Sequence, residues 1–177
     1  MNIDFIKLNK MAIYGGLIAM CISGLGAFLL GNISGYEAKQ LIGASLDGIN
    51  MLCNTIVLAS ATILALLLTL LGISTGTKTK LKDEHYAQVL KIAKFDTILF
   101  ISALLMFQFF NLPIMEADNV PTAWFKYVYW ASLFASSLIS GMMVAIVLLL
   151  YGTITNIIKI VGLGKDHPLL SDEEAEE

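Results

Sequence analysis

Four segments of the chain are continuously apolar over lengths close to that needed to cross a lipid bilayer. They cover about residues 11–30, 49–73, 93–112 and 124–158. A transmembrane α-helix needs about 20 consecutive, predominantly apolar residues. None of the four segments shows the alternating pattern of a barrel strand, and only helices or closed barrels satisfy backbone polar groups in lipid. The pattern predicts an all-α, polytopic membrane protein with four transmembrane helices in an up-down bundle.

Polar residues beside these segments predict that some helices extend beyond the bilayer. Ser34 is followed three residues later by Glu37, which is the spacing of a capping box, so the second helix is expected to begin near Tyr36. Asp83 and Glu84 similarly precede a helical pattern that leads into the third span. The fourth segment is too long for one straight crossing at 1.5 Å per residue, so it must tilt or protrude.

Lysines are distributed unevenly between the two sides of the predicted membrane domain. All of the basic residues are lysines, and only Lys39 and Lys126 lie outside the side that holds both termini and the loop between the second and third spans. Because positively charged loops stay in the cytoplasm, both termini are expected there, at the cell (inner) membrane of a bacterium. Residues 1–162 then form the transmembrane domain, and residues 163–177 form an acidic cytoplasmic tail.

Composition supports a membrane protein and excludes several classes of function. Hydrophobic residues make up 57% of the 177 residues and charged residues 14%, against about 25% charged in soluble domains. With a net charge of −3 there is no basic face for binding nucleic acid. Catalytic sets of residues, a phosphate-binding loop and metal-ligand spacings are missing, so we expect neither an enzyme nor a cofactor.

Small residues recur at alternating intervals of four and three on two of the predicted helices. In lipid such stripes mark close helix contacts, and this spacing fits a left-handed crossing of about +20°. The first helix carries Ala12, Gly16, Ala19, Ser23 and Gly26, and the second carries Ala44, Gly48, Met51, Thr55, Leu58, Thr62, Ala65, Thr69 and Gly72.

Six polar residues of the second helix are candidates for a pore lining or a helix interface. In the pore interpretation the first three share a face and form a cation-selective mouth, and the threonines, seven residues apart, present their hydroxyls to a water path. In the alternative the aspartate is simply hydrated and the threonines bond carbonyls of their own helix. The six are Asp47, Asn50, Asn54, Thr55, Thr62 and Thr69.

Asp96 is the other candidate, because an ionisable side chain in lipid is costly unless it is paired or hydrated. It is expected at the inner end of the third span, near Lys94 and Lys159. One interpretation makes it an inner gate or a proton relay. The other makes it the partner of an interfacial lysine such as Lys159.

Two hypotheses of function follow from these features. In the first, the protein associates with copies of itself through its small-residue stripes and surrounds an ion-permeable path. The alternative is an accessory or scaffold subunit that binds other membrane proteins and transports nothing itself. In both hypotheses the bilayer and other membrane-embedded helices are its partners, and nucleic acid is not.

Overall fold

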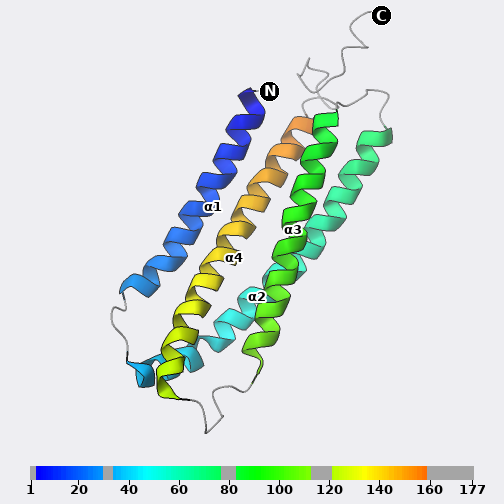
Figure 1. Ribbon diagram of the computed structural model, residues 1–177. Coiled ribbons are helices and arrows are strands. Elements are labelled where there is room, and N and C mark those ends of the chain that lie inside the picture. The colour runs from blue at the N-terminus through cyan, green and yellow to red at the C-terminus, as the bar shows by residue number, and fades with distance from the viewer. Residues whose placement is uncertain (1–2, 30–33, 77–82, 113–120, 159–177) are drawn as a thin grey trace, which may run out of the picture.

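The computed structural model describes residues 3–29, 34–76, 83–112 and 121–158, and these residues form four α-helices. Consecutive helices run in opposite directions, so the start of the first and the end of the last lie at the same end of an elongated bundle (Figure 1). No strand occurs in the described ranges, and the prediction of an all-α fold with four helices is confirmed. The helices are α1 (Ile3–Leu29), α2 (Gly35–Gly76), α3 (Asp83–Phe110) and α4 (Thr122–Ile157).

Two of the helices are long and apolar enough to cross a membrane. These stretches are Tyr36–Gly72 in α2 and Ala123–Ile157 in α4, and α1 contains a shorter apolar stretch, Lys10–Leu25. With 42 residues, α2 is about 63 Å long, roughly twice the ~30 Å of a hydrocarbon core. Length and composition therefore make α2 and α4 candidates for membrane crossing, and α2 is long enough to extend well beyond the bilayer.

The start of α2 is fixed by the capping box that the sequence predicts. The backbone N–H and the hydroxyl of Ser34 both donate to Oε2 of Glu37, at 2.9 and 2.8 Å. In return the backbone N–H of Glu37 donates to Oγ of Ser34 at 3.3 Å. At the start of a helix the backbone N–H groups have no carbonyl one turn earlier to bond to, and here side chains accept from them instead. These bonds confirm the predicted beginning of the helix.

The first helix packs along the last one (Figure 1). Ala12 and Gly16 of α1 and Gly141 of α4 are buried where the two helices meet. The small-residue stripe of the first helix is therefore used inside the chain. It does not reach the far end of the contact, because Ser23 is exposed.

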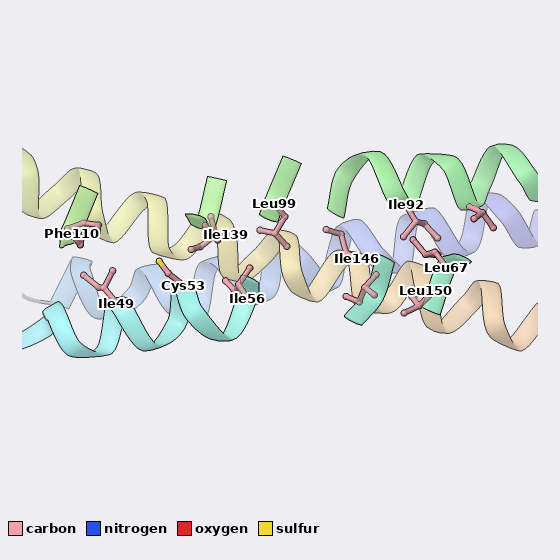
Figure 2. Close-up of a cluster of buried hydrophobic side chains, with 13 residues drawn as sticks. Ile49, Cys53, Ile56, Leu67, Ile92, Leu99, Phe110, Ile139, Ile146 and Leu150 are labelled. Atoms are coloured by element: carbon pink, nitrogen blue, oxygen red, sulfur yellow. The ribbon is translucent and has the colours of Figure 1, made fainter. Parts of the chain in front are cut away.

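The apolar core lies between α2, α3 and α4. Near its N-terminus α2 packs against the beginning of α4, where Ala38 and Ile42 meet Phe125 and Tyr129. The remainder of α2 contributes to a longer cluster shared by all three helices (Figure 2). Members of this cluster labelled in Figure 2 are Ile49, Cys53, Ile56, Leu67, Ile92, Leu99, Phe110, Ile139, Ile146 and Leu150.

Candidate functional site

The small-residue stripe of the second helix faces away from the rest of the chain. We call this set of nine residues the outer face of α2; every member is exposed. A Cβ atom added at Gly48 or Gly72 would have no atom of the described residues within 4 Å, so the face is open at both positions. The members are Ala44, Gly48, Met51, Thr55, Leu58, Thr62, Ala65, Thr69 and Gly72.

The nearly opposite side of α2 packs into the core with the same alternating spacing. Two repeats of 3.5 residues therefore run along one helix, one directed inward and one outward. Packing among the described residues accounts for the inward repeat alone. The inward residues, all buried, are Ile49, Cys53, Ile56, Ser60, Ile63 and Leu67.

The three threonines of the outer face satisfy their hydroxyls within the helix. Thr55 donates to the carbonyl of Met51 at 2.8 Å, and Thr62 and Thr69 make the same bond to the residue four positions earlier, at 2.9 and 3.0 Å. Back-bonding of this kind removes the need for a partner on another helix. The side chains therefore add little bulk and no unsatisfied donor to the outer face.

The three polar residues at the beginning of the second predicted span do not all point the same way. Asp47 and Asn54 are exposed, and they immediately precede Gly48 and Thr55 of the outer face. Asn50 is half-buried, and its side-chain oxygen has no hydrogen-bond partner in the described part of the chain. The structure thus brings Asp47 and Asn54 to the outer side of α2 and turns Asn50 toward the bundle.

A buried hydrogen bond that the sequence analysis did not anticipate joins α3 to α4. The side-chain amide of Gln88 donates to the hydroxyl of Thr153 at 2.9 Å, and that hydroxyl donates in turn to the carbonyl of Leu149 at 3.0 Å. Both Gln88 and Thr153 are buried. The sequence offered one indication of this bond, because Gln88 is a single amide side chain at a position that the helical pattern assigns to the core.

Asp96 lies near the middle of α3, deeper in the bundle than the sequence suggests. Its side chain is fully buried, on the same stripe as Ile92 and Leu99. Neither carboxylate oxygen has a hydrogen-bond partner among the described residues, and the hydroxyl of Ser60 on α2 is likewise unpartnered. Ser60 is close enough to Asp96 for its hydroxyl to act on the carboxyl group, although the two side chains do not form a hydrogen bond of ordinary geometry.

The predicted pairing of Asp96 with a lysine finds no support in the described residues. Lys94 is exposed, whereas Asp96 is buried without a partner. Lys159, the other lysine considered, lies outside the described residues. Asp96 is therefore the one acidic side chain of the described core, and no described residue hydrogen-bonds it.

Cysteines and metal ligands do not assemble into a further site within the described ranges. Cys21 is exposed and Cys53 is buried, both as free thiols. The described residues hold no group of three or more His, Cys, Asp or Glu side chains that would bind a metal ion.

Comparison of the chain with protein-family models, with curated proteins and with solved structures found no match.

Proposed function

We propose that this chain is a four-span membrane protein that associates with copies of itself through the outer face of α2. One observation supports this proposal: the outer face repeats every 3.5 residues from Ala44 to Gly72, and all of its members are exposed within the described part of the chain. A repeat sustained over four heptads is the pattern by which one helix packs along another. Its small residues allow the close approach on which helix association in lipid depends.

The partner helix that fits this face best is α2 of a second copy. All copies of a membrane protein have the same orientation in the bilayer, so two α2 helices meet in parallel. A two-fold axis along the membrane normal then brings each residue of the face opposite its own counterpart. Seven of the nine layers are threonine, alanine or glycine and the other two are Met51 and Leu58, and because the three threonine hydroxyls are already bonded within the helix they need no partner in such a contact.

Cysteine cross-linking in membranes tests this pairing directly. In a Cys21→Ser background, Thr55→Cys, Thr62→Cys and Thr69→Cys are each expected to give disulfide-linked dimers upon oxidation. Val147→Cys, on an exposed position of α4, serves as the matched control and is expected to remain monomeric. Failure of all three α2 positions to cross-link, or equal cross-linking of the control, would rule out the pairing. Purification with a stoichiometric foreign protein would favour the scaffold hypothesis instead.

An ion-permeable path is the second candidate, and the exposed side chains of Asp47 and Asn54 favour it. In a ring of copies with α2 innermost, these side chains would surround one mouth of the central path. The three threonines would follow along its wall. Carboxylates at such a mouth attract cations and repel anions.

A further inference from the structure

We propose that Asp96 is a proton-binding site inside the bundle, with Ser60 as the group that hydrogen-bonds the protonated carboxyl. This site is separate from the outer face of α2 and does not depend on self-association. It rests on the burial of the carboxyl group, on the unpartnered oxygens around it and on the absence of a described counter-charge.

The carboxyl group of Asp96 has no contact with solvent. Its relative exposure is 0%, as is that of Ser60, and its neighbours along the stripe, Ile92 and Leu99, are exposed by 1% and 0%. Three oxygens of these two side chains have no hydrogen-bond partner among the described residues: Oδ1 and Oδ2 of Asp96 and Oγ of Ser60. A buried polar group without a hydrogen bond is unfavourable, and a buried charge without a partner is far more so.

None of the helices packed around Asp96 supplies a compensating charge from its described residues. On α2 the facing polar group is Ser60, and the nearest titratable one is the thiol of Cys53, two helical turns away. Lys91 and Lys94 of α3 are exposed on other sides of that helix. The buried residues of α4 that share the core with Asp96 are apolar or hydroxylic.

Binding of a single proton removes the unpaired charge from this site and supplies a hydrogen-bond donor. The protonated carboxyl carries no charge, and its O–H can donate to Oγ of Ser60, which gives two of the three oxygens a partner. A divalent metal ion suits the site poorly, because Ca²⁺ and Mg²⁺ require six or more oxygen ligands and these two side chains offer three. The proton is therefore the ligand that the site can bind with the groups it has.

Binding of this proton favours contact between α2 and α3. The neutral carboxyl can remain in the apolar interface, whereas the carboxylate needs water or a cation beside it. Release of the proton thus requires water to reach the interface between the two helices. The site links the protonation of one residue to the closure of that interface.

Infrared spectroscopy of the protein in liposomes measures this protonation directly. A protonated carboxyl has a carbonyl band distinct from that of a carboxylate, and at pH 6 an aspartate in water is almost fully ionised, since its ordinary pKa is about 3.9. At pH 6 we expect a protonated-carboxyl band in the wild-type protein and in the control Asp47→Asn, and its loss in Asp96→Asn. Absence of the band in the wild-type protein, or its persistence in Asp96→Asn, would overturn the proposal.

Two further measurements test the proposal even if Asp96→Asn fails to fold. In the wild-type protein alone, the band is expected to disappear as the pH is raised above neutrality. The titration curve should be the same in NaCl and in KCl. Loss of the band upon addition of Na⁺ at constant pH would instead indicate a site for an alkali cation. Ser60→Ala is expected to shift the frequency of the band, because it removes the acceptor of the carboxyl proton. An unchanged frequency would show that Ser60 is not the partner.

Discussion

Gly16 on α1 and Gly141 on α4 each occupy the space that a side chain on the other would need. A Cβ atom on Gly16 would lie 2.8 Å from the carbonyl oxygen of Gly141, and a Cβ on Gly141 would lie 2.7 Å from the carbonyl oxygen of Gly16. The obstacle in both directions is backbone, which cannot move aside as a flexible side chain can. The two helices therefore touch at a point where only glycine fits on both sides.

Replacing Gly141 by alanine is expected to destabilise the contact between α1 and α4. Overpacking of this kind costs about 1–3 kcal/mol. The measurement is reversible unfolding in a denaturing detergent. Gly48→Ala is the matched control, because its Cβ would enter open space and alanine is the better helix former. Equal stability of the two variants would contradict the described crossing.

Leucine at Gly48 is expected to weaken self-association without weakening the fold of the single chain. Its side chain would project from the outer face of α2 and hold two copies apart, while nothing within the chain lies in its way. We expect the dimer dissociation constant in detergent to rise by roughly tenfold or more, or about 1.4 kcal/mol. Ala131→Leu, at an exposed position of α4, controls for added bulk and should leave the constant unchanged.

Removing Thr153 alone from its bond with Gln88 is expected to cost more than removing both side chains. In Thr153→Val the buried amide of Gln88 loses its acceptor, with a penalty of about 1–3 kcal/mol. In Gln88→Leu the hydroxyl of Thr153 still donates to Leu149, so the loss should be smaller. The double variant should recover part of the stability, and a double-mutant cycle of unfolding free energies checks this. Strict additivity would show that the two side chains do not interact.

Neutralising Asp47 is expected to reduce the preference of any ion flux for cations. Because Asp47 is exposed beside the outer face, its carboxylate would lie at the mouth of a path lined by α2. The assay is K⁺ and Cl⁻ flux from liposomes containing wild-type protein or Asp47→Asn. Glu37→Gln removes another exposed carboxylate of α2 and should leave selectivity unchanged. Without flux in the wild-type protein the ion-path hypothesis fails, while self-association stands on its own test.

The helices could be predicted from the sequence, because each depends on local information. Continuous apolar segments gave their number, and the pair Ser34 and Glu37 gave the start of α2 to within one residue. Pro121, with its fixed φ, directly precedes α4. Such signals act within one helix and need no knowledge of its neighbours.

The orientation of each helix face could not be predicted in the same way. In water an apolar stripe turns inward, but in a bilayer, where we propose that this chain lies, lipid is as apolar as the core and exerts no such preference. α2 carries two stripes with equal spacing, and the sequence does not reveal that Ile56 and Ser60 face inward while Thr55 and Thr62 face outward. The burial of Asp96 opposite Ser60 was missed for the same reason, because it depends on how two such helices are rotated against each other.

The contact between α1 and α4 has a consequence for how the protein is made. Along the chain α1 precedes α2, α3 and α4, so the surface around Gly16 is completed by a helix that is synthesised after two others. Until α4 has been synthesised, the part of α1 that contains Gly15 and Gly16 lacks the helix that packs against it. The contact between α1 and α4 can therefore form only after α4 has been made, and a ribosome stalled before α4 would leave α1 without its neighbour.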